Sequence, residues 1–186
     1  MVATVKLFGN RLSPFVEKVA RGLSLKRIDF RVITPRSPFD LARWNPHTKK
    51  MPVVDIEGER LHDSTFILRR LDALVPQPPL LAPSPLVAAA QRQLEDWADE
   101  SLYWYGMALR WTPENGPQTA TQIFSQLPAL VRPLAMLAGP RQIRGMVFAQ
   151  GLGRLPAEVL LRELATHLDD LVLLLDDCPF FYAPIP

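Results

Sequence analysis

The sequence is poor in the residues that build disulfides and metal centres. It holds a single cysteine, Cys178, and three histidines in 186 residues. One cysteine excludes an intrachain disulfide and is typical of proteins from a reducing compartment. His47, His62 and His167 show no metal-ligand spacing with one another or with Cys178, so we expect no metal site.

Charge of one sign and long apolar runs are equally scarce. The formal net charge is +2, and no run of Lys or Arg is large enough to cover a face, so nucleic acid is not expected as a partner. The longest apolar run near the end, 171–175, is far too short to span a bilayer. Residues 1–10 lack the basic and apolar regions of a secretory signal. We therefore expect a cytoplasmic protein.

Prolines, in contrast, are abundant, and their placement divides the chain. The 19 prolines include clusters at 76–85, at 113–133 and at the C-terminus. The first cluster has the composition of a stiff, extended linker. It separates a region of strands and helices from a region almost without strand signals. We therefore predict two domains, residues 1–77 and residues 84–186.

Hydrophobic periodicity and turn residues predict the order β-α-β-α-β-β-α for the first domain. The strand–helix–strand start implies a right-handed parallel crossover, and the later hairpin adds antiparallel strands to the sheet. The predicted elements are strands at 3–8 and 28–33, helices at 14–24 and 38–44, a hairpin opened by Pro52 with a turn at Glu57-Gly58, and a helix at 64–74.

The proline that opens this hairpin points to a binding site. A proline cannot donate to a strand ladder, and an X–Pro bond is the common place for a cis peptide. A cis Met51–Pro52 bond would turn the backbone polar groups of Met51 outward, where an extended peptide could pair with them. Asp63 and Ser64 follow, and they offer a carboxylate, a hydroxyl and the free N–H groups of a helix start. The segment predicts a site for a small anionic peptide.

The second domain begins with a long predicted helix. Ser84 is the expected N-cap, and the helix should run from Pro85 to about Trp111. Tryptophans recur every seven residues along it, with small residues between them, which predicts one continuous stripe. This stripe is either a seam between packed helices or the wall of an apolar ligand pocket. Its members are Trp97, Ser101, Trp104, Ala108 and Trp111.

Shorter helices are expected further along the second domain. Pro128, Pro133 and Gly139-Pro140 interrupt residues 120–150, so short helices are predicted there. A final helix should run from Pro156 to near Asp176. Its apolar residues at helical spacing predict a buried stripe. They are Leu160, Leu161, Leu164, Leu168, Leu171 and Leu175.

Taken in order, several motifs resemble those of the glutathione S-transferase superfamily. These are Ser13-Pro14-Phe15 after the first strand, the segments 45–50 and 51–54, and Asp63-Ser64. The Ser-Pro-Phe and Lys-Lys-x-Pro-Val segments are most similar to the plant tau class. The resemblance implies a thioredoxin-like α/β N-terminal domain followed by an all-α C-terminal domain. It also implies a glutathione transferase that uses glutathione as co-substrate, with no tightly bound cofactor.

Ser13 is the catalytic residue that the resemblance implies. A thiol has an unperturbed pKa of about 8.5, and only the thiolate attacks electrophiles. A hydroxyl donor near a helix N-terminus would favour the thiolate through one hydrogen bond and the helix dipole. The alternative is that Ser13 merely caps the helix that begins at Pro14.

Other residues would hold the rest of glutathione. Lys50 would contact the glycyl carboxylate, and the backbone of Met51, shaped by Pro52, would pair with the cysteinyl portion. Ser64 would bind the γ-glutamyl carboxylate, and Asp63 the γ-glutamyl ammonium. The alternatives are a solvated surface lysine and a simple helix N-cap. Candidates for the wall of an apolar substrate pocket are Phe15, Tyr103, Trp104 and Met107.

The second domain resembles a different branch of the superfamily. The segments 63–67, 100–104 with Arg110-Trp111, and 150–154 are similar to those of the metaxin and failed-axon-connections branch. In the family, a segment like 177–182 leads into further core helices, so the last helices are expected to be missing here. We expect a homodimer that detoxifies small apolar electrophiles or peroxides. The alternative is a non-catalytic module that uses the same scaffold to bind a partner.

Overall fold

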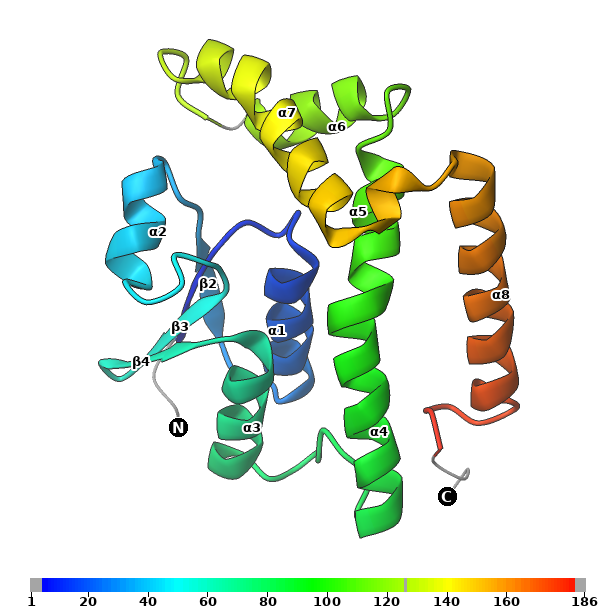
Figure 1. Cartoon of the computed structure of the whole chain (residues 1–186). Helices are drawn as coiled ribbons and strands as arrows, with labels where there is room; N and C mark the ends of the chain where they lie inside the picture. Colours follow the sequence, from blue (N-terminus) through cyan, green and yellow to red (C-terminus); the bar gives the residue numbers. More distant parts are fainter. Residues whose placement is uncertain (1–4, 126, 183–186) are drawn as a thin grey trace. The chain divides into compact units, whose positions relative to one another are not determined.

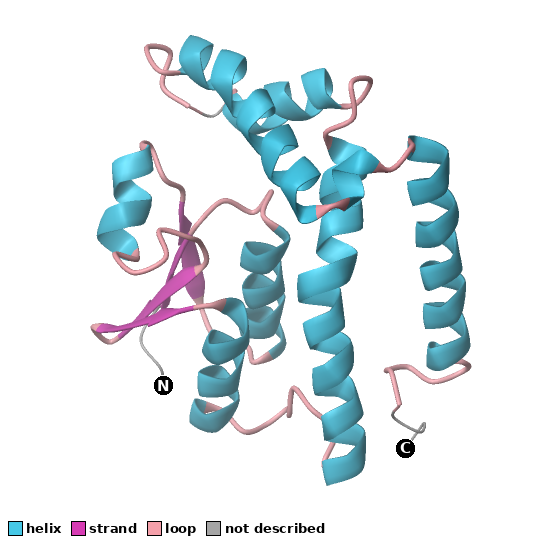
Figure 2. Ribbon diagram, viewed as in Figure 1, coloured by secondary structure: helices cyan, strands magenta, loops and turns pink. Residues whose placement is uncertain are grey.

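The computed structural model describes residues 5–125 and 127–182. The chain divides into two compact units, with the boundary between Leu80 and Leu81. Figures 1 and 2 show a first unit that combines strands and helices and a second unit built from helices.

The first unit is built on a four-stranded sheet in the order β2-β1-β3-β4. β1 (Val5–Phe8) pairs in parallel with β2 (Phe30–Ile33) and antiparallel with β3 (Val53–Ile56), and β3 forms a hairpin with β4 (Glu59–His62). The helices are α1 (Pro14–Leu25), α2 (Pro38–Trp44) and α3 (Ser64–Leu74). The predicted thioredoxin-like order is confirmed, although residues 3 and 4 of the first predicted strand lie outside the described residues.

Side-chain alternation along the strands builds a three-layer unit. Val5 and Leu7 of β1 are buried among residues of α1 and α3, whereas Phe8 packs with Trp44 of α2. Successive side chains of a strand point to opposite faces of the sheet. Figure 1 accordingly shows α1 and α3 on one face and α2 on the other. The hairpin turns at Glu57 and Gly58, which both have positive φ, as a two-residue turn of the primed type requires.

The second unit is helical and begins with one long stretch in three parts. α4 (Pro85–Trp97) passes through a π-helical turn, Ala98–Leu102, into α5 (Tyr103–Arg110). The long helix was predicted, but its π-helical turn was not, because the apolar periodicity continues through it. The elements that follow are α6 (Gly116–Phe124), α7 (Arg132–Gln150), a short 3₁₀ turn (Leu152–Arg154) and α8 (Ala157–Leu175).

The prediction of short helices across 120–150 is wrong for α7, which continues through Pro140. An interior proline costs about 3 kcal/mol because it removes one backbone hydrogen bond and crowds the preceding turn. Packing offsets this cost. A Cβ placed on Gly139 would lie 2.4 Å from Cζ of Phe124 in α6, so the two helices approach closely at that glycine.

The predicted buried stripe of α8 is also wrong in most of its length. Leu160 is buried with Ala108 and Val147, but Leu161 is 55% exposed and Leu168 is 48% exposed. The leucines recur at helical spacing, yet only Leu160 is buried, whereas Leu164, Leu171 and Leu175 are half-buried. In the tryptophan stripe, by contrast, Trp111 is buried and Trp104 packs against the same cluster, as a seam between packed helices requires. Within the described chain, no helix is both long and apolar enough to cross a membrane.

Candidate functional site

Ser13 lies in the turn between β1 and α1, at the N-cap position of the helix. Its backbone carbonyl accepts from the N–H of Glu17 at 3.0 Å, but its side chain makes no capping hydrogen bond. Pro14 follows at the first helical position, where its missing N–H costs nothing. The hydroxyl is therefore half-buried at a helix N-terminus and is not used to cap that helix.

An exposed ion pair links the residues on either side of the turn that carries Ser13. Arg11 donates to both carboxylate oxygens of Glu17, through Nε at 2.8 Å and Nη2 at 3.0 Å. The side-chain hydrogen bond from Arg11 lowers the pKa of the Glu17 carboxyl, and the same bond raises the pKa of the Arg11 guanidinium. The Oδ1 of Asn10 also accepts from the N–H of Leu12 at 2.9 Å. These bonds fix the backbone on either side of Ser13.

The turn that carries Ser13 contacts the segment that carries Met51. The backbone N–H of Asn10 donates to Sδ of Met51 at 3.4 Å. Gly9 permits this approach, because a Cβ there would lie 2.5 Å from Val16 and 3.5 Å from Cβ of Met51. The Met51–Pro52 peptide bond is cis. The structure therefore brings two of the predicted site segments together, although they lie about forty residues apart in the sequence.

Asn45 organises the loop that leads to Met51. This residue is only 2% exposed. Its side-chain nitrogen donates to Oγ1 of Thr48 at 2.6 Å and to the carbonyl of Lys50 at 3.2 Å, and its Oδ1 accepts from the N–H of Thr48 at 3.1 Å. The amide thus holds the loop while the side chain of Lys50 extends into solvent.

Asp63 and Ser64 form the start of α3. Oδ1 of Asp63 accepts from the N–H groups of Thr65 at 2.9 Å and Phe66 at 3.4 Å. Within the described residues, Oδ2 of Asp63 and the N–H and hydroxyl of Ser64 have no protein partner. Ser64 is 4% exposed. Asp63 has φ 71° and ψ 131°, a sparsely populated conformation that recurs at ligand clamps.

Asp63→Ala should lower the free energy of unfolding by about 1 kcal/mol, because the first turn of α3 loses its side-chain cap. Asp63→Asn should be nearly neutral for stability, since an amide oxygen can accept the same two hydrogen bonds. Urea denaturation followed by circular dichroism measures both changes. Equal losses in the two variants would contradict a capping role for Asp63.

The remaining candidates belong to two units and are described separately. In the first unit, Phe15 is half-buried in the first turn of α1. In the second unit, the rings of Tyr103 and Trp104 lie 5.3 Å apart at an angle of 68°. Burial raises the pKa of the Tyr103 phenol, and Arg110 opposes this shift. Trp104 and Met107 pack against the buried cluster of Ala108.

Sequence comparison identifies the family of the chain. Residues 7–79 match the family model described as "Glutathione S-transferase, N-terminal domain". The isoprene-epoxide–glutathione S-transferase of Rhodococcus sp. (strain AD45) is 31% identical over 182 residues, which cover 91% of this chain and 72% of that protein. The chain belongs to the glutathione S-transferase family.

Plant tau-type proteins and a bacterial structure extend this relationship. Glutathione S-transferase U3 of Arabidopsis thaliana is 33% identical over 108 residues, which cover 55% of this chain and 48% of that protein. The chain thus spans about half the length of the plant glutathione S-transferases that it matches. The crystal structure of the beta-etherase LigF from Sphingobium sp. strain SYK-6 shares the fold. It superposes with a TM-score of 0.66 at 18% identity, covering 94% of this chain and 74% of that one.

Two asparagines that hold the candidate site were not predicted as site residues. In the sequence, Asn45 indicates a helix end before Pro46 and belongs to the segment 45–50 that resembles the family, and Asn10 indicates a strand break after Gly9. Their hydrogen bonds hold the loops on which Met51 and Ser13 lie. Their position in loops beside the predicted site residues was the available signal, since asparagine side chains often bond to nearby backbone in turns.

Proposed function

We propose that this protein is a glutathione transferase in which Ser13 stabilises the glutathione thiolate. The observation that carries the proposal is the Ser13 hydroxyl, which stands at the N-cap of α1 without capping it. A hydroxyl there can donate to an anionic sulfur, and the positive end of the helix dipole favours the same charge. No base is needed, because the hydroxyl stabilises the nucleophile and does not itself attack.

Unused polar groups at the start of α3 suit the γ-glutamyl end of glutathione. The N–H and hydroxyl of Ser64 would donate to its carboxylate. Oδ2 of Asp63 would accept from its ammonium while Oδ1 keeps the helix cap. The unusual backbone of Asp63 supports this role, because such conformations persist mainly where a ligand or a packed neighbourhood requires them.

The cysteinyl and glycyl residues of glutathione would lie along the segment that contains the cis Met51–Pro52 bond. The backbone of Met51, beside Pro52, would pair with the cysteinyl residue as a short antiparallel strand. The ammonium of Lys50 would attract the glycyl carboxylate from solvent. Glutathione is supported as the ligand because the family and the related isoprene-epoxide enzyme both carry it in their names. The second substrate would be a small apolar electrophile or peroxide that meets Phe15, Tyr103, Trp104 or Met107.

A calorimetric titration with glutathione tests the binding part of the proposal. Ser64→Ala should weaken glutathione roughly tenfold, because it removes a hydrogen bond to a charged group. Asp63→Asn should weaken glutathione by a similar factor without the stability loss of Asp63→Ala. Ser24→Ala, in an exposed position of α1, is the matched control. Unmodified protein that binds no glutathione would overturn the proposal.

The non-catalytic alternative rests on a separate observation. Apolar side chains of α8 are exposed, among them Leu161, Val172 and Leu173, and exposed apolar patches mark interaction surfaces. A helical unit of the metaxin and failed-axon-connections type would use such a surface to bind a partner. This alternative predicts glutathione binding without turnover of a chloronitroaryl substrate. We also propose that the protein is cytoplasmic and forms a homodimer. Light scattering after size exclusion would test the dimer.

A further inference from the structure

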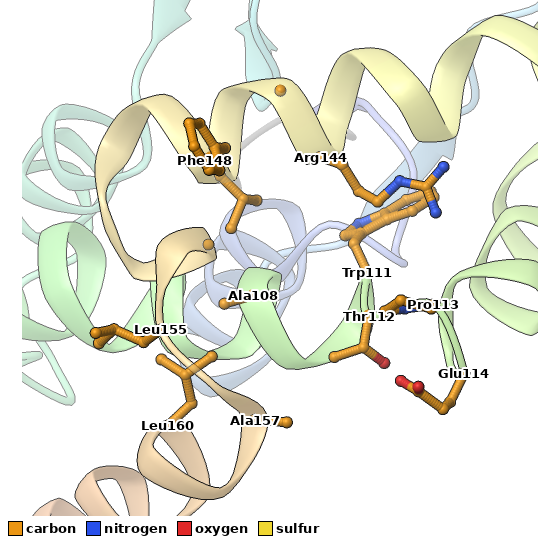
Figure 3. Close-up of a pocket in the computed structure, with 13 residues that line it drawn as sticks. Ala108, Trp111, Thr112, Pro113, Glu114, Arg144, Phe148, Leu155, Ala157 and Leu160 are labelled. Carbon is orange, nitrogen blue, oxygen red and sulfur yellow. The ribbon is translucent and has the colours of Figure 1, made fainter.

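A cavity of about 580 Å³ lies inside the second unit (Figure 3). It is bounded by the end of α5 and the turn that follows, by the C-terminal half of α7 and by the start of α8. None of its lining residues belongs to the first unit or to the residues proposed to bind glutathione. Its volume is that of a small-molecule site.

One residue of the lining carries a buried donor without an acceptor. Trp111 is 3% exposed. Its Nε1 is the one buried side-chain nitrogen or oxygen of the described residues that lacks a hydrogen-bond partner. A buried donor left unpaired costs about 1–3 kcal/mol. Such groups are rare in folded proteins, and each calls for a physical reason. An acceptor supplied by a ligand is such a reason.

An unpaired cation borders the same cavity. Arg144 is exposed on α7 and, among the described residues, has no hydrogen-bond or ion-pair partner. Its neighbours are engaged, since Arg141 donates to the carbonyl of Leu137 at 3.1 Å and Arg154 donates to that of Phe148 at 3.0 Å. In Figure 3 the Arg144 side chain extends toward the Trp111 end of the cavity.

The rest of the lining is largely apolar. Ala108, Phe148, Leu155 and Leu160 form a wall on which a hydrocarbon chain or ring could pack. Phe148 and Leu155 are 57% and 43% exposed, so a ligand would cover apolar surface that now faces water. Glu114 is the one acidic residue of the lining, and in Figure 3 it lies on the side of Thr112.

We propose that this cavity binds an apolar monocarboxylate. Its carboxylate pairs with the guanidinium of Arg144 and accepts from Nε1 of Trp111, and its hydrocarbon part packs against Phe148, Leu155 and Leu160. The exposed Arg144 side chain moves with the carboxylate to bring it to the indole. Glu114 disfavours a second negative charge, which restricts the ligand to one acidic group.

Octanoate, with 1-octanol as its uncharged counterpart, tests the proposal on the full chain without glutathione. The readout is the indole N–H signal of Trp111 in a nitrogen–proton correlation spectrum, assigned by its loss in Trp111→Phe. Octanoate should move this signal downfield in a saturable manner, because the N–H gains an acceptor. Octanol should bind at least roughly tenfold more weakly, because it cannot form the charge-assisted bond to Arg144.

Variants on α7 distinguish the proposed octanoate contacts from non-specific hydrophobic binding. Arg144→Met should weaken octanoate roughly tenfold, whereas Arg141→Met, three residues away on the same helix, should leave it unchanged. Gly145 lines the cavity, and a Cβ there meets no atom within 4 Å, so Gly145→Leu should be tolerated by the helix and should abolish binding by occupying ligand space. An unmoved Trp111 signal, equal binding of octanol, equal effects of the two arginine variants, or full binding by Gly145→Leu would each overturn the proposal.

Discussion

Lys26→Met is expected to lower the free energy of unfolding by about 3 kcal/mol, the largest stability loss that we predict for a single substitution. The side chain of Lys26 is 0% exposed at the end of α1. Its ammonium donates to the carboxylate of Asp72 in α3. It also donates to the carbonyls of Val75 and Pro78, both at 2.6 Å. Methionine fills a similar volume but removes the ammonium from all three acceptors.

This lysine ties the end of the first unit to its helices. Asp72 also accepts from the N–H of Leu80 at 3.1 Å, so the pair holds residues 75–80 at both ends. We expect Lys26→Met to speed hydrogen exchange across this segment. The stability loss itself is measured by urea denaturation followed by circular dichroism.

Arg21→Met is the control for Lys26→Met. Arg21 lies on the same helix and forms an exposed ion pair with Glu17 at 3.2 Å, which contributes little to stability because solvent screens it. Both substitutions remove one positive charge from α1, so their difference isolates the buried contacts. Equal losses in the two variants would show that the buried ammonium contributes nothing beyond its charge.

Ser13→Ala is expected to lower kcat/KM for glutathione conjugation roughly 100-fold, the effect of removing one donor to a developing or stabilised anion. Glutathione affinity should stay within about twofold, because the charged ends of the tripeptide would contact Lys50, Asp63 and Ser64, which Ser13→Ala leaves in place. The two measurements are the rate with a chloronitroaryl substrate and a calorimetric titration with glutathione.

The pH dependence of Ser13→Ala gives a second readout. If Ser13 stabilises the thiolate, the bound thiol has a pKa below its ordinary value of about 8.5. Losing the hydroxyl should raise the pKa of the bound thiol, so the rising limb of the pH–rate profile should move to higher pH. A purely structural role for Ser13 would leave the profile in place.

The chain supplies its own matched control for Ser13. Ser37 is the N-cap of α2 and is likewise followed by proline and phenylalanine. Ser37→Ala makes the same chemical change at a second helix start and should leave conjugation unaltered. Unchanged activity in Ser13→Ala, or equal losses in both variants, would rule out Ser13 as the thiolate donor and point to another source of thiol activation.

The elements of the first unit were predictable because their signals are local. The turn at Glu57-Gly58, the prolines at helix starts and the alternation of Val53–Ile56 each act within a few residues. A cis bond at Met51–Pro52 was predicted for the same reason and is present. The order of elements followed from these signals together with the handedness of parallel crossovers.

Packing partners were not predictable from local signals. Helical spacing shows which face of α8 is apolar but not whether anything covers it, and so the stripe through Leu161 and Leu168 was wrongly expected to be buried. The prediction of a helix end at Pro140 was wrong for the same reason, because the close approach of Gly139 to Phe124 depends on a second helix.

The sequence by itself determined the secondary structure of the first unit and pointed to Met51, Asp63 and Ser64, because capping, turn and strand signals are local. Ser13 was named through the resemblance of its Ser-Pro-Phe segment to a family motif. Tertiary structure decided what those groups contact. Only the fold shows that Asn10 meets Met51, that Lys26 reaches residues 46 to 52 positions away, and that Trp111 is buried with its N–H unpaired. Hydrogen-bond partners and burial arise between segments distant in the chain, and no local pattern encodes them.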